Sequence, residues 1–456
     1  FWLTALAMGR LAWRCSRLRP DLLLEVLFGS GLLALATLLA GMGGIWSPIF
    51  ARLLLIVGAS AGLVVLVPHI RSWSVLVRRP LPVMLVWTWL PFAFVVLLGP
   101  TLCLPLGWDE QTYQLAVPAR WLRDGFPHCY LDLPYSAFPG AGTMPVWLVM
   151  AAGGMLAPRL LILTQWLLLA AAIFRWLQRY TTGNHAVPGL LTTAFCLSPA
   201  VLMVAGEVYM ELFILLNCLA CLLLLEELPT APQSDWLLGV GLGAVLATKL
   251  TGILLMPPLL LAWWLHRKGW RSVWPPWLAI FIFLLPFYLR PWLLTGNPCH
   301  PYFAAWFGRD PGLLASSAYH HAVAATKFGI AGLPGLLWNP VLISWAKRVF
   351  DGNFGWAYLA VLALAVWGAR QERSVRWCLA MAGLAYFGWY LSARQARFLL
   401  PGFLFLLPAA ACGMQHLSAR WRNCLACCLG LLALGSVPTA LLGHCRLCWQ
   451  GAIGRI

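Results

Sequence analysis

The segment Trp108–Pro145 reads WDEQTYQLAVPARWLRDGFPHCYLDLPYSAFPGAGTMP and is the longest polar interval in a chain that is 61% hydrophobic. It directly follows an apolar run, 81–106, that is long enough to cross a bilayer. The neighbouring carboxylates Asp109 and Glu110 open it. Charged groups at the mouth of a membrane span cost free energy, so the pair predicts a functional site. A solvated loop is the alternative, and the length of the interval makes it the weaker hypothesis.

The composition of the whole chain excludes a soluble globular protein. Only 10% of the 456 residues are charged, whereas about a quarter of residues are charged in soluble domains. The mean hydropathy is +0.80. The formal net charge of +17 is spread in short basic clusters between apolar runs, a pattern that orients membrane helices and argues against a nucleic-acid partner. The sequence therefore predicts an all-α polytopic membrane protein.

The 14 cysteines do not indicate a disulfide scaffold, because most of them lie inside apolar runs, where they act as small hydrophobic residues. Cys445 and Cys448 form a CxxC pair with no second CxxC, so a metal or redox role is the weaker hypothesis there. The first apolar run is too long for a signal peptide and lacks a cleavage site of small residues. We therefore expect no cleaved leader.

The basic clusters set the expected orientation. Residues 1–20 and the linker 70–80 are rich in arginine and should both lie in the cytoplasm. With the N-terminus inside, the segment Trp108–Pro145 emerges on the extracytoplasmic side. The two clusters agree, which makes this the strongest topological prediction from the sequence.

We expect one integral membrane domain, 1–456, in the cytoplasmic (inner) membrane of the cell, with no separate soluble domain. Two large extracytoplasmic loops, 104–159 and 291–352, should carry short surface helices, and the first should hold the active site. About thirteen transmembrane helices are expected, at 22–43, 51–69, 83–104, 160–178, 187–205, 210–226, 236–250, 252–266, 274–290, 353–368, 376–392, 398–414 and 423–442.

The first loop should contain two short helices. Two helical turns that start at Asp109 place this residue and Tyr113 on one face, four residues apart. Pro118 should interrupt or restart the helix, and Gly125 should end it. The apolar segment Gly142–Leu156 is short, and we expect it to lie on the outer surface as a helix instead of crossing the membrane.

On this topology most unusual polar residues fall on the outer side. Outer arginines oppose the positive-inside trend, and a phosphate-bearing ligand would explain them, because the guanidinium fork binds phosphate and stays charged. Contact with lipid headgroups, or pairing with nearby carboxylates, stays open as the alternative. The outer set is Asp109, Glu110, Glu207, Glu211, Lys249, Arg290, His300, His320, His321, Arg394 and Arg397.

Three acidic or basic members of this set, each close to a predicted span, indicate a cavity beyond the first loop. Glu207 and Glu211 flank Tyr209 at a spacing of four at the start of a span, and both would face one cavity. A helix N-terminus also favours acidic residues, and this alternative stays open. Lys249 lies deep in the motif ATKLTG and is costly in a membrane unless it is paired or faces water. We expect it to line the site, with snorkelling as the alternative.

These residue types indicate acid–base chemistry. Asp109 could take a proton from an acceptor hydroxyl while basic residues stabilise a departing phosphate. HxxxH, HExxH and DxD motifs are absent, and the adjacent side chains of His320 and His321 diverge, so we predict no metal site and require no cofactor. A divalent cation, Mg²⁺ or Mn²⁺, stays open only if it is held by the carboxylates of Asp109, Glu110, Glu207 or Glu211.

At these residues the sequence resembles the GT-C superfamily of polytopic glycosyltransferases, specifically the bacterial group related to aminoarabinose transferase and protein O-mannosyltransferases. The shared pattern is an acidic pair after an early span, a tyrosine and an amphipathic stretch ending in glycine, here Asp109, Glu110, Tyr113 and ARWLRDG. The similarity continues across most of residues 20–415 through LPYSAFPGAGTMP, VYME, GLGAVLATKLTG, RPWLLTGNPCHP and RQARFLLP. Two departures are GTMP in place of the Lys-Pro-Pro element of the aminoarabinose branch, and Glu211 where an aspartate is usual.

The resemblance implies a GT-C-like fold and transfer of a sugar from a polyprenyl-phosphate donor to a lipid, glycan or protein acceptor at the outer face of the cytoplasmic membrane. It implies Asp109 as the base, with Glu110 beside it in the catalytic pair. The implied ligands of the donor phosphate are Lys249, Arg290, Arg394 and Arg397. The candidate substrate-binding residues are Tyr113, Glu207, Tyr209, Glu211, Asn297 and His300.

Two other classes of function stay open. A transporter or flippase for a lipid-linked or anionic substrate would also need buried charge, but such proteins usually show repeat symmetry and charges near the bilayer midplane. A catalytically silent GT-C-like subunit of a larger membrane complex is the third hypothesis. The sequence does not specify the donor sugar, the prenyl chain or the acceptor.

Overall fold

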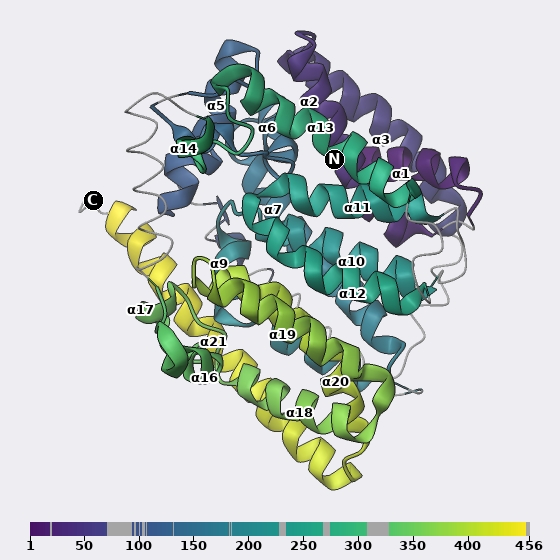
Figure 1. Ribbon diagram of the computed structural model, residues 1–456, viewed down its shortest axis with the longest axis vertical. Helices are drawn as coiled ribbons and strands as arrows, with labels where there is room; N and C mark the ends of the chain where they lie inside the picture. Colours follow the sequence, from purple (N-terminus) through teal and green to yellow (C-terminus); the bar gives the residue numbers. More distant parts are fainter. Residues whose placement is uncertain are drawn as a thin grey trace. The chain divides into compact units, whose positions relative to one another are not determined.

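The computed structural model describes the chain apart from residues 19–20, 71–93, 95–96, 100, 103–104, 106, 131, 182, 184, 228–233, 268–273, 308–327 and 453–456. Most of the expected span at 83–104, and the pair His320 and His321, lie outside the described residues. Within the described part, every regular element is a helix (Figure 1). This confirms the all-α prediction, as expected for long apolar runs, because in a bilayer a helix satisfies its backbone polar groups within one segment.

Five described helices are long and apolar enough to cross a membrane, and up to six are if one bent pair counts as a single span. The chain is therefore an integral membrane protein. The expected total of about thirteen spans stays a prediction, because several further apolar helices are shorter than a full crossing. The five are α2 (Leu22–Met42), the first 21 residues of α3, Pro48–Pro68, α7 (Ala157–Gln178), α13 (Trp274–Thr295) and the stretch Ala396–Gln415.

The bent pair lies where the sequence predicted one span at 187–205. The helix α8 (Ala186–Cys196) and the helix α9 (Pro199–Gly206) meet at an angle of 65°. Ser198 between them is extended, with φ −61° and ψ 142°, because a proline disfavours the helical conformation in the residue before it. Pro199 then occupies the first turn of α9, where its missing N–H is not needed.

The chain divides into two compact units, and each is described by itself. Unit 1 comprises Phe1–Arg78, Trp108–Leu161 and Phe213–Ala322. Its elements are α1 (Trp2–Cys15), α2, α3 (Pro48–Ile70), η2 (Glu110–Gln114), α5 (Ala116–Asp124), η3 (Pro134–Ala137), α6 (Thr143–Gly153), most of α10 (Glu211–Glu227), α11 (Asp235–Thr248), η5 (Leu250–Leu255), α12 (Met256–His266), α13 and α14 (Ala304–Phe307).

In unit 1 the short helix α1 packs directly against the backbone of α2. A Cβ atom on Gly9 would lie 1.7 Å from the carbonyl oxygen of Glu25, so glycine is required at this crossing. The Nε of Arg10 donates to Oε2 of Glu25 across 2.7 Å. Small residues let helices approach in this way inside membrane proteins, where dispersion contacts and buried polar pairs hold them together.

The helix expected at Gly142–Leu156 forms as α6, and protein covers it. It packs against α2, α3 and α5, and its residues 144–151 are all buried. The expected helix of the first loop also forms as α5, which ends at Gly125 with φ +68°, the left-handed conformation that glycine adopts without strain. Pro118 lies in the first turn of α5, so it starts this helix without breaking it.

Unit 2 comprises Arg79–Gly107, Ile162–Leu212 and Val323–Ile456. In it α20 packs against α18 and α19, and α21 packs against α8 and α9. Its elements are most of α7, α8, α9, α16 (Gly332–Leu342), α17 (Lys347–Phe350), α18 (Ala357–Gln371), η6 (Arg373–Val375), α19 (Arg376–Tyr390), η7 (Ala396–Leu399), α20 (Leu400–Gln415) and α21 (Ala419–Ala452).

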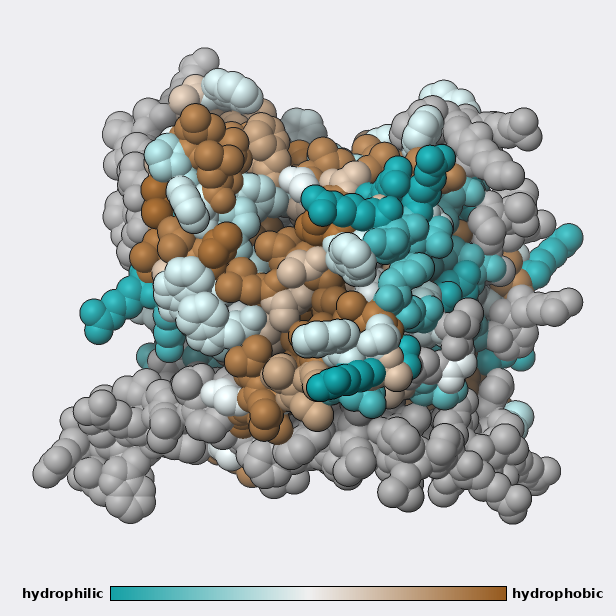
Figure 2. Space-filling view, turned by 90° about the horizontal axis from the view of Figure 1, so that it is seen from below, coloured by the Kyte–Doolittle hydropathy of each residue, from teal (hydrophilic) through white to brown (hydrophobic). Residues whose placement is uncertain are grey.

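Apolar side chains are exposed on the described surface, as lipid contact requires. Ile56, Val57 and Val64 on α3 are all largely exposed. Figure 2 shows broad apolar areas on the face it draws, beside a region where hydrophilic side chains gather. A surface of this kind would aggregate in water but is stable against acyl chains.

Candidate active site

The acidic pair of the first loop lies at the start of a π-helical turn. Asp109 immediately precedes the turn Glu110–Gln114, and the N–H of Leu115 donates to the carbonyl of Glu110 across 3.0 Å. A π-turn inserts one residue into a helix and turns the side chains around it out of their usual register, and such turns occur often at functional sites. The two neighbouring carboxylates therefore meet different partners.

Asp109 is held by a tyrosine from the next turn. The hydroxyl of Tyr113 donates to Oδ2 of Asp109 across 3.0 Å, and the aspartate is only 8% exposed. This confirms that the two residues share a face, as their spacing of four predicted. This hydrogen bond fixes the direction of the carboxylate.

Glu110 forms a buried ion pair with Arg159. The Nε of Arg159 lies 2.9 Å from Oε1 of Glu110, and the side chains are 3% and 0% exposed. The arginine belongs to the first turn of α7, 49 residues along the chain. A buried pair of this kind costs much to break, because the remaining partner would be left as an uncompensated charge.

Aromatic rings continue from Tyr113 toward the second loop. Its ring stacks on Tyr135 with centroids 4.5 Å apart, and it meets Phe138 edge-on at 6.4 Å. Phe138 in turn stacks on Tyr302 at 6.3 Å. The segment that follows α5 is thus packed both on the residue that holds Asp109 and on the segment that follows α13.

Arg290 lies inside unit 1, where its side chain binds two backbone carbonyls of the first loop. Its guanidinium donates from Nη1 to the carbonyl of Pro127 across 3.1 Å and from Nη2 to the carbonyl of Phe138 across 2.6 Å. Its Cζ lies 5.1 Å from the ring centre of Trp121. The side chain is 1% exposed. The contacts of Arg290 in the described residues are therefore made with neutral groups.

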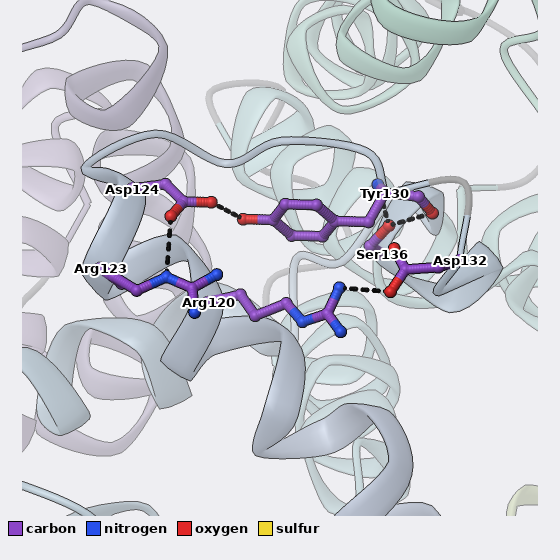
Figure 3. Close-up of polar contacts among 6 residues, drawn as sticks. All are labelled: Arg120, Arg123, Asp124, Tyr130, Asp132 and Ser136. Atoms are coloured by element: carbon purple, nitrogen blue, oxygen red, sulfur yellow. Dashed lines mark hydrogen bonds and ion pairs between the residues drawn. The ribbon is translucent and has the colours of Figure 1, made fainter.

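The exposed part of the same loop carries a polar network (Figure 3). The Tyr130 hydroxyl donates to Asp124 across 2.5 Å, and Arg120 lies 2.7 Å from Asp132. The hydrogen bond from Tyr130, and then the one from Arg123, lower the pKa of Asp124. Burial, and then that same hydrogen bond, raise the pKa of Tyr130. These contacts are exposed, so each contributes little to stability.

Three more candidates from the sequence lie in unit 1. Lys249 is buried just after α11, close to the first loop, because the N–H of Ala141 donates to the carbonyl of Ala247 across 2.8 Å. Asn297 donates to the carbonyl of Tyr302 and accepts from the N–H of Cys299, so it shapes the NPCHPYF segment. His300 is buried in that segment.

The remaining candidates lie in unit 2, where Arg397 gathers most of them. Its Cζ lies 4.7 Å from the ring centre of Tyr209, and its Nε lies 3.8 Å from Oε1 of Glu211. Its Nη2 donates to Gln395 across 2.9 Å, and Gln395 donates to Asp351 across 3.0 Å. In this arrangement a buried arginine lies against an aromatic ring, with the carboxylate of Glu211 nearby.

Arg394 is close in sequence to Arg397, and Glu207 is close in sequence to Tyr209, but these two residues have other contacts. Arg394 donates from Nε to the carbonyl of Phe328 across 2.6 Å, and its Cζ lies 5.7 Å from the ring centre of Tyr390. Glu207 is buried at the end of α9 in extended backbone. Among the described residues no cluster of three or more His, Cys, Asp or Glu side chains could hold a metal ion.

The structure adds residues that the sequence did not predict for the site. Arg159 carried a usable signal, because on the expected topology it is another outer-face arginine at the start of a span. Trp121, Tyr135 and Gln395 carried no such signal, because aromatic rings are common in this loop and a neutral amide side chain does not mark a site. The added residues are Arg159, Trp121, Tyr135 and Gln395.

No family model matches the chain, and no curated protein matches it. Among solved structures, the chain is similar to ArnT from Cupriavidus metallidurans, in a crystal structure bound to undecaprenyl phosphate. The TM-score is 0.54 at 14% sequence identity, and the match covers 75% of this chain and 61% of ArnT. The chain therefore matches about three-fifths of that protein. At this identity the likeness is one of fold, and over the matched part the chain shares the fold of this GT-C protein.

Proposed function

We propose that the chain is a glycosyltransferase that moves a sugar from a polyprenyl-phosphate donor to an acceptor hydroxyl, with Asp109 as the general base. The observation that carries the proposal is the buried Asp109 carboxylate, held by Tyr113 in a π-helical turn of a GT-C fold. A buried, oriented carboxylate is suited to accepting a proton in a membrane protein. The proposed location is the outer face of the cytoplasmic membrane.

The proposed reaction is a displacement at the anomeric carbon of the donor sugar. The oxygen of the acceptor hydroxyl forms the new bond to this carbon, and the carbon–oxygen bond to the phosphate breaks. Asp109 receives the hydroxyl proton, and the polyprenyl phosphate leaves with the bonding electron pair. Cations near the leaving phosphate would stabilise the charge that develops there.

In this proposal Glu110 does not exchange protons with substrate. It is paired with Arg159 and lies fully buried, so its role is to hold the π-helical turn that directly follows Asp109. The ion pair fastens this turn to the first turn of α7. Arg159 is therefore a positioning residue for the base.

We propose that buried cations bind the donor phosphate, with Lys249 as the candidate in unit 1 and Arg394 and Arg397 as the candidates in unit 2. A buried cation is suited to this role because its hydrogen bonds to phosphate are charge-assisted and little weakened by water. The guanidinium of Arg290 is engaged by two loop carbonyls, so we propose another role for it. The undecaprenyl phosphate bound to ArnT supports a polyprenyl lipid as the partner here.

The test uses the purified chain in lipid nanodiscs with labelled undecaprenyl-phosphate sugars and a cell-envelope extract as the source of acceptors. Release of undecaprenyl phosphate is measured by mass spectrometry, because this product does not depend on which acceptor is used. We expect release that requires both the protein and the extract. Movement of the donor between leaflets without release would indicate a flippase, and binding without either activity would indicate a silent subunit.

A further inference from the structure

Arg290 differs from Arg10 and Arg159, two other arginines of unit 1 whose side chains have little exposed surface. Arg10 and Arg159 each face a carboxylate, at 2.7 Å and 2.9 Å. Arg290 instead meets two carbonyl oxygens and one ring, and its Nε has no hydrogen-bond partner among the described residues. A buried cation on neutral partners must satisfy its donors geometrically, and here the acceptors come from two separate points of one loop.

The two acceptors bracket the part of the loop that packs on Tyr113, the residue that donates to the proposed base. Pro127 follows α5 closely, and Phe138 ends the 3-10 turn η3. One guanidinium thus joins the two ends of this segment, which would otherwise gain conformational entropy by opening. Phe138 contacts the ring of Tyr113, whose hydroxyl donates to Asp109. A continuous path of contacts therefore leads from Arg290 to the proposed base.

We infer that Arg290 is a positioning residue that closes the segment between Pro127 and Phe138 and so holds Tyr113 against Asp109, instead of binding the donor phosphate. Its meaning for catalysis rests on the proposed function. Closure of the loop is a property of the protein alone and can be measured without any turnover.

Cys129 lies inside the closed segment and reports on it. The thiol is half-buried and takes part in no disulfide. Burial raises the pKa of Cys129, and the charge of Arg290 lowers it. Removing the arginine charge alone would therefore decrease the thiolate fraction and slow the reaction with maleimide. An increase in rate can only come from opening of the segment, so the two effects have opposite signs.

The experiment compares maleimide labelling of Cys129, read by peptide mass spectrometry, in wild type, Arg290→Met and Arg290→Lys in nanodiscs. Each substitution removes the guanidinium, and with it the hydrogen bonds that this charged donor makes to the two carbonyls. We expect Cys129 of Arg290→Met to be labelled about tenfold faster than Cys129 of the wild type. Arg290→Lys should also label faster, because a single ammonium does not reproduce the planar fork that reaches both carbonyls. Arg123→Met is the matched control, since Arg123 is an exposed arginine of the same loop whose ion-pair partner, Asp124, lies outside the segment, and labelling of this variant should stay at the wild-type rate.

Binding of undecaprenyl phosphate to the same variants distinguishes the positioning role of Arg290 from a role as a phosphate ligand. We expect the affinity of Arg290→Met to fall less than about threefold while its labelling rises. If donor turnover is present, its kcat should fall with little change in KM. Unchanged or slower labelling together with a large loss of affinity would overturn the inference and assign Arg290 to the phosphate. If Arg290→Met does not fold, Arg290→Lys decides, because the phosphate role predicts that it keeps both affinity and slow labelling.

Discussion

Arg159 donates from Nε to Oε1 of Glu110 across 2.9 Å, in a place where neither side chain reaches solvent. The pair connects the first turn of α7 to the π-helical turn that directly follows Asp109. The pair gives Glu110 a different environment from its neighbour Asp109, although the sequence alone does not distinguish the two carboxylates. One is fixed by an arginine, and the other is oriented by a tyrosine hydroxyl.

A double-mutant cycle tests the positioning role of this pair. Arg159→Met leaves a buried carboxylate without its arginine, and such a loss costs about 3–5 kcal/mol of stability. Replacing both residues in Arg159→Met/Glu110→Met removes both charges, so thermal stability should recover most of that loss. Undecaprenyl phosphate release should recover in part with it. A double variant as stable as wild type but wholly inactive would instead give Glu110 a direct part in the chemistry.

Tyr113→Phe removes the hydrogen bond to Asp109 but keeps the ring that stacks on Tyr135. A hydrogen bond to a charged group contributes about 1.5–3 kcal/mol, so the loss in kcat should be about tenfold or more. The melting temperature should change little, since the ring contacts stay. Steady-state release of undecaprenyl phosphate gives kcat and KM. An unchanged kcat would mean that the hydroxyl does not orient the base.

Lys249→Met tests the proposed phosphate role of the lysine after α11. We expect the affinity for undecaprenyl phosphate, measured by microscale thermophoresis in nanodiscs, to fall by about tenfold, as loss of one buried charge contact predicts. Lys249→Arg keeps the charge and should keep most of the affinity. Equal binding by Lys249→Met and wild type would leave the lysine as a side chain that snorkels toward the interface.

Arg397→Ala should weaken undecaprenyl phosphate binding more than it lowers the melting temperature. The guanidinium is buried beside the ring of Tyr209, and an arginine fork forms strong, charge-assisted hydrogen bonds to phosphate. Arg348→Ala is the matched control, because Arg348 is exposed in the same unit. Wild-type affinity in Arg397→Ala, with lowered stability, would confine Arg397 to its contacts with Tyr209, Gln395 and Glu211.

The sequence predicted the helices well where their ends carry chemical signals. The span expected at 22–43 is α2, Leu22–Met42, because Asp21 accepts a hydrogen bond from the N–H of Leu24 at its start and Gly43 follows its end. Residues four apart on one helix, such as Asp109 and Tyr113, were also predictable. The extra residue of the π-turn was not, since nothing in the spacing of EQTYQ differs from an ordinary helix.

The partners of the buried arginines lay beyond sequence reasoning. Glu110 and Arg159 are 49 residues apart, and no local pattern connects them. Arg290 was predicted as a phosphate ligand from its charge and its outer position. Its acceptors are backbone carbonyls, which every residue carries, so no residue type marks them. Only tertiary packing decides which cation meets a carboxylate and which meets a loop.

Asp109→Asn tests the central claim most directly. The asparagine keeps the size of the side chain and can still accept from Tyr113, but it cannot take up the acceptor proton. Release of undecaprenyl phosphate in nanodiscs should fall by about a hundredfold or more, as for loss of a general base, with unchanged donor affinity and melting temperature. Asp124→Asn, at an exposed carboxylate of the same loop, should keep wild-type release. Full activity of Asp109→Asn under these conditions would contradict the assignment of the base.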